Sequence, residues 1–506
     1  MHRCLHIVEV LEMIFREFDG RKGRATLARL ARTCRTFSPG ALDLLWKAPG
    51  SLDPILGLFP ADLVALRPTE GRKLQWEILR PIAFNDWDRV AVYAPRVKSF
   101  YLGFSTLEKT SKVLPVLSFC SPRGLVFPNL RYLGCTFVTI NPALIRPLLP
   151  AGLEEFSLLC QADTESLSII SVLGDLCPGL KTVTIHLANS ESNDPKPSLS
   201  NLLHTLRRLV SLTIDMPDAA DIAHLGQLST LKTLQLGTLP HGLSSLPVPS
   251  YPLFPNLVEL RISHAEIQSA IAFLAFCANT PLASLRLNFA STSSDADVAR
   301  FYHALKLACA HDSLRVLRIV HSAEVMARKS LRILASFEQL RELAISAASF
   351  EFDDQTIGNL ATSWPFLQKL NLMVCTLDIL VDPPITLHAF RLLVRHCPML
   401  HFLRLDVDAS QVPPAEPTRI GPHSLEHLDV GCSRILHAPS VARYLSGLFP
   451  KLESITTDRE YEDNDDPDEI AANEVAIERH RLWKQVESEV PEFVAAREEE
   501  HPRDPL

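Results

Sequence analysis

The sequence predicts an α/β fold: a leucine-rich-repeat solenoid, with a curved parallel sheet plus helices, follows a small all-helical N-terminal module. Two observations support this prediction. The spacing L-x-x-L-x-L returns down most of the chain, and stretches with apolar residues at helical spacing separate its copies. The first apolar positions of the units, about 14 in all, are Val97, Leu130, Leu153, Leu180, Leu209, Leu231, Leu257, Leu282, Leu314, Leu340, Leu367, Leu400, Leu425 and Leu452.

The repeated spacing indicates which backbone each part of a unit forms. In L-x-L the residues alternate as the side chains of a β-strand do, so the leucines point inward. Before Pro398, the residues Phe390, Leu393 and Val394 fit a short helix that the proline ends. Units recur about every 27 residues, within the leucine-rich-repeat range. One strand and one helix cannot bury these leucines alone, so the copies must stack. The alternative is an ordinary leucine-rich α/β fold.

The bulk composition is that of a globular protein. Apolar residues make up 47% of the 506 residues and charged residues 21%. No apolar run reaches the length of a membrane span, and charged residues interrupt the N-terminus too early for a secretory signal. The 11 cysteines include no C-x-x-C pair, which favours reduced thiols. We therefore expect a cytoplasmic and/or nuclear protein without membrane contact.

The net charge of −8 comes from the C-terminal tail. Residues 458–506 hold 17 acidic and 6 basic residues, whereas the remainder holds 41 acidic and 44 basic residues. The body is therefore nearly neutral and carries no basic excess of the kind that indicates a nucleic-acid partner.

Residues 2–48 follow a different pattern from the repeats. Val8, Leu11, Ile14 and Phe15 lie on one face of a predicted helix, and two further short helices follow it. Three such helices cannot cover this much apolar surface. We expect either a partner protein or the neighbouring solenoid to cover part of it.

These residues resemble an F-box. The stretches 5–15, 27–37 and 41–46 are similar to the F-box of fungal, mushroom-type (basidiomycete-type) F-box proteins with leucine-rich repeats. In that family the module docks on a Skp-type adaptor and through it on a cullin. One departure is Val8, which stands where the family usually has the proline that opens the first helix. The resemblance implies these adaptor-facing residues: Leu5, Val8, Leu11, Ile14, Phe15, Leu30 and Cys34. The alternative is a plain helical cap on the solenoid.

The rest of the chain divides into three further segments. Residues 49–96 form an ordered junction with a helix, a hairpin and a capped helix. The solenoid covers residues 97–457. The tail, 458–506, opens with an acidic run at 460–469, and a helix that ends at Pro491 follows. We expect this helix to pack on the last repeat as its cap; the alternative is a free helix that meets another protein.

The sequence contains no catalytic constellation. It lacks the phosphate-binding, dinucleotide-binding, zinc-protease and nucleophile-elbow motifs. Its 18 histidines show no metal-ligand spacing with the cysteines. The sequence therefore predicts a protein that is not an enzyme and that needs no cofactor and no metal.

The outward-facing strand positions predict a binding surface. Arg261, Arg286 and Arg318 occupy the same position of three successive units, on strands about 4.8 Å apart. With Lys369 and Arg404 nearby, they predict a target-binding stripe for an acidic or phosphorylated segment, because the planar guanidinium fork suits carboxylate and phosphate. The alternative is that three carboxylates pair with the arginines and neutralise them; these are Glu259, Glu342 and Asp406.

Together these observations favour a substrate-recognition subunit of a Skp–cullin–F-box ubiquitin ligase that binds its target protein on the repeat surface. The competing interpretation is a leucine-rich-repeat scaffold with no ubiquitin-ligase role.

Overall fold

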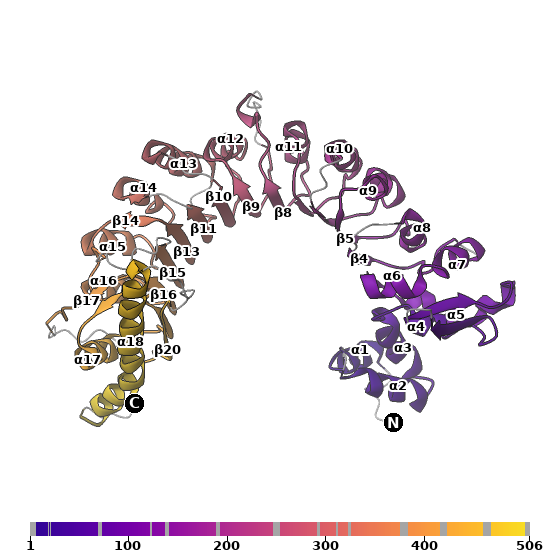
Figure 1. The fold of residues 1–506 in the computed structure, drawn as a ribbon, viewed down its shortest axis with the longest axis horizontal. Coiled ribbons are helices and arrows are strands. Elements are labelled where there is room, and N and C mark those ends of the chain that lie inside the picture. The colour runs from indigo at the N-terminus through magenta and orange to yellow at the C-terminus, as the bar shows by residue number, and fades with distance from the viewer. Residues whose placement is uncertain are drawn as a thin grey trace. The chain divides into compact units, whose positions relative to one another are not determined.

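A computed structural model describes most of the chain, in two compact units, Met1–Leu231 and Lys232–Leu506 (Figure 1). No helix in the described part is long and apolar enough to cross a membrane. The described residues are 7–18, 20, 22–68, 73–121, 124–136, 141–188, 193–245, 253–290, 294–309, 312–321, 325–374, 383–414, 423–458 and 467–500.

The first unit begins with a module of three helices, α1 (Val8–Arg16), α2 (Arg24–Thr33) and α3 (Ser38–Lys47). Its core consists of four buried residues, Leu11, Phe15, Leu27 and Ala41. The Phe15 ring meets Phe37 edge to face at 5.8 Å. The module thus has a small core of its own.

The predicted junction contains the expected hairpin. Strands β1 (Val64–Pro68) and β2 (Leu74–Ile78) pair antiparallel. The short helix α4 (Asp53–Leu56) precedes them, and α5 (Asp88–Tyr93) follows them. Single 3-10 turns flank α5 at η2 (Phe84–Trp87) and η3 (Ala94–Arg96).

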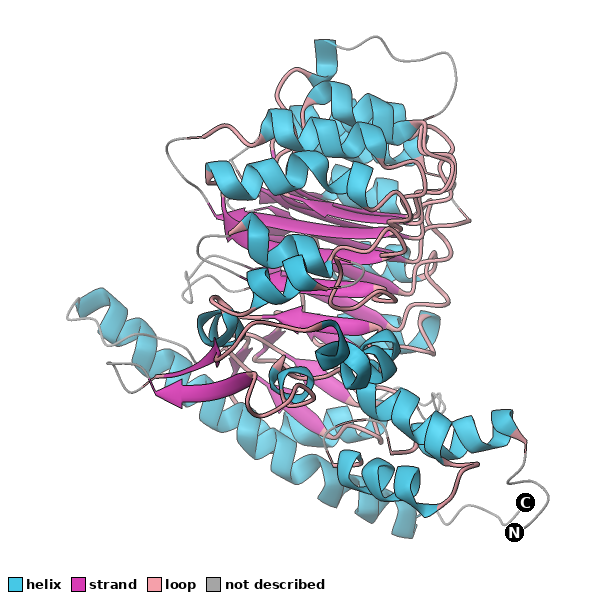
Figure 2. Ribbon diagram, turned by 90° about the vertical axis from the view of Figure 1, so that its right-hand side faces the viewer, coloured by secondary structure: helices cyan, strands magenta, loops and turns pink. Residues whose placement is uncertain are grey.

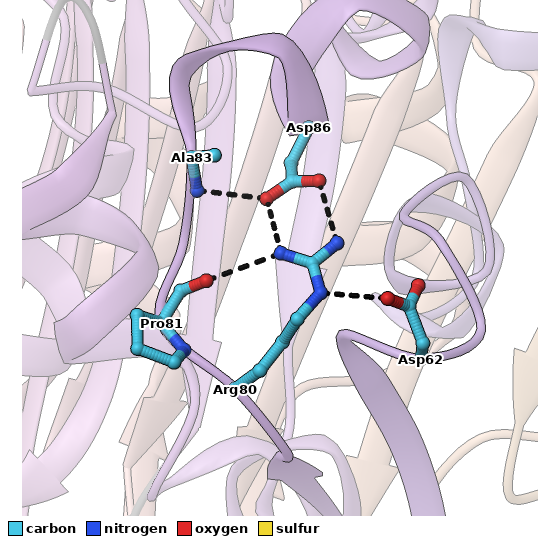
Figure 3. A network of polar contacts seen from close by, with 5 residues as sticks. All are labelled: Asp62, Arg80, Pro81, Ala83 and Asp86. Carbon is cyan, nitrogen blue, oxygen red and sulfur yellow. Dashed lines mark hydrogen bonds and ion pairs between the residues drawn. The ribbon is translucent and has the colours of Figure 1, made fainter.

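An arginine organises the turn after this hairpin (Figure 3). Arg80 donates both Nη atoms to Asp86 at 2.9 Å and its Nε to Asp62 at 2.7 Å. Asp86 also accepts the backbone N–H of Ala83. The hydrogen bonds from Arg80 and Ala83 lower the pKa of Asp86 to about 2. The buried carboxylate therefore stays charged and fixes the chain where it enters α5.

The array confirms the strand positions that the repeats predict. In every predicted unit a strand begins two residues after the first apolar position, including the less regular units at Leu153, Leu209 and Leu282. All but one of the first positions are at most 1% exposed, and Leu452 is 9% exposed. The leucines are buried because each one packs within its own repeat and against the neighbouring repeats. The parallel-sheet α/β arrangement is therefore confirmed.

In the first unit the described array contains five parallel strands and the helices between them. The strands are β3 (Ser99–Leu102), β4 (Tyr132–Thr136), β5 (Glu155–Gln161), β6 (Thr182–Ala188) and β7 (Ser211–Ile214). The helices are α6 (Phe104–Thr110), α7 (Leu114–Cys120), α8 (Pro142–Ile145), η4 (Arg146–Leu148), α9 (Thr164–Leu176), α10 (Lys196–Thr205) and α11 (Ala219–Gly226).

In the second unit nine parallel strands follow one another among the described residues. They are β8 (Thr233–Thr238), β9 (Glu259–Ala265), β10 (Ser284–Phe289), β11 (Val316–His321), β13 (Glu342–Ala347), β15 (Lys369–Val374), β16 (Phe402–Leu405), β18 (His427–Asp429) and β20 (Ser454–Thr456). The intervening helices are η5 (Leu243–Ser245), α12 (Ile267–Phe276), α13 (Asp295–Ala308), α14 (Arg328–Leu334), α15 (Asp354–Ala361), α16 (His388–His396) and α17 (Ala438–Leu448).

Within each unit the helices cover one face of the strands and leave the other face open (Figures 1 and 2). Two small parallel pairs that the repeat pattern does not predict also occur in the second unit: β12 (Val325–Ala327) with β14 (Ser349–Glu351), and β17 (Asp408–Ala409) with β19 (Arg434–Ile435). The open face of the sheet is the surface on which the predicted arginine stripe falls.

The N-terminal module joins the array through the backbone. The N–H of Lys98 donates to the carbonyl of Lys47 at the end of α3, at 2.8 Å. The same bond occurs in the next repeat, where the N–H of Arg131 donates to Lys98 O at 2.8 Å. The Trp46 and Tyr93 rings also lie 4.8 Å apart. The module is therefore a bonded continuation of the array, and the junction covers part of its apolar surface.

The C-terminal helix α18 (Pro467–Glu500) packs against α17 and strands β19 and β20. The prediction of a capping helix is confirmed, but the prediction that it ends at Pro491 is wrong. Proline removes one helical hydrogen bond. Beyond it, Arg497 donates to the carbonyl of Arg443 at 2.8 Å and to Ser446 Oγ at 3.2 Å, which holds the last turns against α17. Most of the acidic run at 460–469 lies outside the described residues.

Candidate binding surfaces

The predicted adaptor-facing residues separate into two groups. Val8 is 64% exposed and Ile14 is 39% exposed. Leu11 and Phe15 are buried, at 6% and 2%, so the prediction that they face a partner is wrong. They fill the core because a module of three short helices needs most of its large apolar side chains to form a hydrophobic core.

The remaining predicted positions are intermediate or undescribed. Leu30 is partly buried and packs against the module core. Cys34 is a free thiol that is also partly buried. Leu5 lies outside the described residues.

One side of α1 is apolar and open, and the prediction covered only part of it. At about 100° per residue, Ile7, Val10, Met13 and Ile14 fall within an arc of about 120°. Met13 is 67% exposed and Ile7 49% exposed, and Val10 is half-buried. We call these four residues the α1 face. Val8 lies on the other side of the buried stripe. The spacing of Ile7, Val10 and Ile14 was the sequence signal for this face.

Arg261, Arg286 and Arg318 lie side by side, as predicted. The strand register pairs Arg286 with Arg261 on one side and with Arg318 on the other. We call these three residues the arginine ladder. Burial and its two arginine neighbours lower the pKa of Arg286.

Ion pairing neutralises the ends of the ladder but leaves its centre. Arg261 Nη2 lies 2.7 Å from Glu259, and Arg318 Nε donates to Glu342 at 2.5 Å. The neutralising alternative is therefore correct for those two arginines. Arg286 forms no ion pair among the described residues, and its buried Nε has no hydrogen-bond partner there.

The other two predicted cations differ from the ladder. Lys369 is exposed on β15, in register with Glu342. Arg404 is already held, because its guanidinium reaches Asp429 at 2.7 Å and Asp458 at 2.5 Å. The expectation that Asp406 pairs with an arginine is wrong, since Asp429 and Asp458 take that place.

The sequence named Asp406 only as an arginine partner and gave no signal of its unusual pKa. Burial and the nearby charges of Asp458 and Asp429 raise its pKa to about 7, although Arg404 opposes the shift. The side chain also fills the space next to Gly431, whose backbone has a φ of +52°. A Cβ at Gly431 would lie 2.0 Å from the Asp406 carboxylate.

Asp406→Asn should change how stability depends on pH. Because the folded pKa exceeds the unfolded value of about 3.9, the folded state holds a proton that the unfolded state has lost between these values. The free energy of unfolding of the native chain should therefore fall as pH rises from 4 to 7, by roughly 1–3 kcal/mol, because Asp406 is only partly buried. Denaturant titrations from pH 4 to pH 8 measure it. The difference in the free energy of unfolding between the native chain and Asp406→Asn should change across that window. If the two free energies change with pH in parallel, the raised pKa of Asp406 is wrong.

Metal-ligating and thiol side chains are scattered over the described residues. These residues contain no group of three His, Cys, Asp or Glu side chains that could hold a metal ion. Burial raises the pKa of the Cys177 and Cys397 thiols to about 12, so these thiols are poor nucleophiles.

No family model matches the chain, and no curated protein matches it. Among solved structures, it is similar to a chain of the yeast Rad7 and Elc1 complex, known from a crystal structure. The two chains are 16% identical, the match covers 90% of this chain and 91% of that chain, and the TM-score is 0.39.

Proposed function

We propose that this protein is the substrate-recognition subunit of a Skp–cullin–F-box ubiquitin ligase. Helices α1–α3 act as the F-box and dock on a Skp-type adaptor, which links the chain to a cullin. The open face of the repeat array holds the target protein. The chain itself supplies geometry and no chemistry, and it acts in the cytoplasm and/or the nucleus.

The α1 face is the observation that carries this proposal. The module already has a core, yet Ile7, Met13 and Ile14 remain exposed on one side of its first helix. Covering an exposed side chain of this size is worth about 1.5–3 kcal/mol. Clustered apolar exposure on so small a module is typical of a protein interface.

The attachment of the module also suits a recruiter. The backbone bond from Lys98 to Lys47 and the side-chain contact of Arg96 with Asp43 join the module to the junction. An adaptor bound to α1 would therefore hold the start of the array in a defined orientation. Defined orientation is what a ligase needs to present a target, because transfer requires positioned partners.

Co-expression with a Skp-type adaptor tests the proposal. The native chain should co-purify with the adaptor in a stable complex. Met13→Glu with Ile14→Glu should weaken the complex at least about 100-fold, since two apolar contacts are lost. Glutamate is well tolerated on a helix, so the module should remain folded.

A matched control separates docking from general stickiness. Phe119 on α7 is 92% exposed, and Phe119→Glu should leave the complex unchanged. Failure of the folded native chain to bind any Skp-type adaptor would reject the proposal. Equal binding by the double variant would reject the α1 face as the docking surface.

The second candidate is a leucine-rich-repeat scaffold without a ligase role. It is favoured by the Lys98 to Lys47 bond, which continues the backbone pattern of the array into the module as an end cap would. The same co-expression distinguishes the two, because a cap has no reason to bind an adaptor.

A further inference from the structure

The open face of strand β10 carries two polar groups without partners. Ser284 Oγ and Arg286 Nε are buried, and neither has a hydrogen-bond partner among the described residues. Because they are two residues apart on a strand, their side chains leave the same face. Both groups can donate a hydrogen bond. Two unsatisfied donors on one face of a strand are costly unless a ligand accepts their hydrogen bonds.

Among the arginines and glutamates around this pair, the positive charges outnumber the negative charges by one. Three arginines stand on β9, β10 and β11, and two glutamates, Glu259 and Glu342, stand on β9 and β13. Each glutamate is held by its own arginine, Arg261 or Arg318. Arg286 therefore has two like-charged neighbours and, among the described residues, no ion pair of its own, although Glu259 and Glu342 act on it from beside the neighbouring arginines.

We propose that Ser284 and Arg286 form the seat for a single carboxylate from an acidic segment of a partner protein, with Arg261 and Arg318 flanking it. The inference deepens the proposed function, because the partner would be the target that the array recruits. The planar guanidinium of Arg286 suits a carboxylate, and the Ser284 hydroxyl adds a further donor.

The surroundings favour a carboxylate over phosphate. Arg286 offers one uncompensated charge, which one carboxylate balances. A phosphate monoester carries close to two negative charges at pH 7 and would face Glu259 and Glu342 across the ladder. A nucleic acid would need a longer basic row, but Gln235 and Ala344 occupy the neighbouring positions on β8 and β13.

Fluorescence anisotropy with the full-length chain tests the seat. The probe is a labelled Gly/Ser peptide of about 12 residues with a central Asp/Glu cluster, and its matched control carries Asn and Gln instead. The acidic peptide should bind at least about 10-fold more tightly than the amide peptide. Arg286→Gln should weaken it by about 10–100-fold, and Ser284→Ala by several-fold.

A matched variant controls for loss of charge alone. Lys451 is exposed just before β20, at the end of the strand order and far from β10, so Lys451→Gln removes the same charge without touching the seat. It should change the affinity less than about 3-fold, in line with a distant, screened charge. If Lys451→Gln and Arg286→Gln weaken peptide binding equally, the peptide is held by general charge attraction and not by the seat.

Stability measurements show whether Arg286 has only a structural role. Arg286→Leu removes an unpaired charge that is partly buried between two arginines. The midpoint of thermal unfolding should therefore stay the same or rise while peptide binding is lost. A lowered midpoint together with lost binding would make Arg286 a structural residue and overturn the proposal.

Two further binding measurements identify which group occupies the seat. A peptide with phosphoserine replacing one Glu should bind no more tightly; an Arg286-dependent gain of 10-fold or more would assign the seat to phosphate. Neutralising the seven acidic residues at 460–469 should leave peptide affinity unchanged. A 10-fold gain there would assign the seat to the chain's own tail.

Binding of the acidic peptide only above about 1 mM would overturn the carboxylate seat. Adaptor capture is measured separately and should be the same for Arg286→Gln as for the native chain. Failure of this inference is thereby distinguishable from failure of the proposed function.

Discussion

Trp483→Ala is expected to destabilise the C-terminal end of the array by about 3–5 kcal/mol. Trp483 is fully buried on α18, and its indole N–H donates to the carbonyl of Ser433 at 3.0 Å. Alanine would leave both a cavity and an unsatisfied carbonyl in the same place. No other side chain of α18 contributes a comparable buried volume in the described part of the helix.

Hydrogen exchange resolved by segment measures this effect, because a repeat array need not unfold as one unit. Protection should fall in α17, β20 and α18 and remain in the first unit. Ile477 on the same helix is 56% exposed, and Ile477→Ala should stay within about 0.5 kcal/mol of the native chain. Equal protection in Trp483→Ala and the native chain would show that α18 does not cap the array.

Helix α18 matters because the last strand of a sheet leaves backbone groups open. The N–H of Ile455 on β20 donates to Glu487 Oε1 at 2.7 Å, and Lys484 Nζ donates to Ile455 O at 2.8 Å. Two side chains of the helix thus complete the hydrogen bonding that a further strand would provide. Trp483, which lies next to Lys484 in sequence, anchors these contacts.

The repeat strands were predictable because the rule that places them is local. A leucine three residues before another, followed by alternation, buries one face wherever it occurs, so even the irregular units at Leu153 and Leu209 have their strands. The junction hairpin was predictable for the same reason, since two short apolar runs stand on either side of a polar Gly-containing stretch of the sequence.

The end of α18 was not predictable from the local rule. A proline ends a helix when nothing else holds the following turns. Here Arg497 bonds to Arg443 and Ser446 on α17, which are 54 and 51 residues away in sequence. Such tertiary contacts are invisible in the pattern around Pro491.

The candidate site shows the same division. The row that contains Arg261, Arg286 and Arg318 follows from the repeat, so the sequence placed the ladder correctly. Which arginine remains without a carboxylate depends on side-chain conformations across several strands. The pattern gave no signal for Ser284, because serine is common on an open strand face. Only the structure shows that its hydroxyl has no hydrogen-bond partner among the described residues.

The helical face of the N-terminal module was predicted as one surface, but the structure divides it. The stripe of Leu11 and Phe15 is the core, and the side with Met13 and Ile14 is open. An amphipathic pattern marks which residues are apolar, not whether the chain or a partner covers them. That difference decides which substitutions test docking and which test folding.

Phe15→Ala should unfold the N-terminal module and leave the array intact. Phe15 is 2% exposed and meets Phe37 edge to face within a core of four buried residues. Truncating a buried phenylalanine costs about 3–5 kcal/mol, which is as much as a core of this size supplies. Limited proteolysis should therefore cut within residues 8–47 of the variant first, whereas the native module resists.

Comparing Phe15→Ala with the double variant of the α1 face separates loss of folding from loss of docking. Met13→Glu with Ile14→Glu should lose the adaptor with the module still protected, whereas Phe15→Ala should lose both the adaptor and the protection. Retained protection in Phe15→Ala would mean that the three helices are stabilised chiefly by the junction, through contacts such as Trp46 with Tyr93. The two variants thereby separate the residues that build the docking module from those that meet its partner.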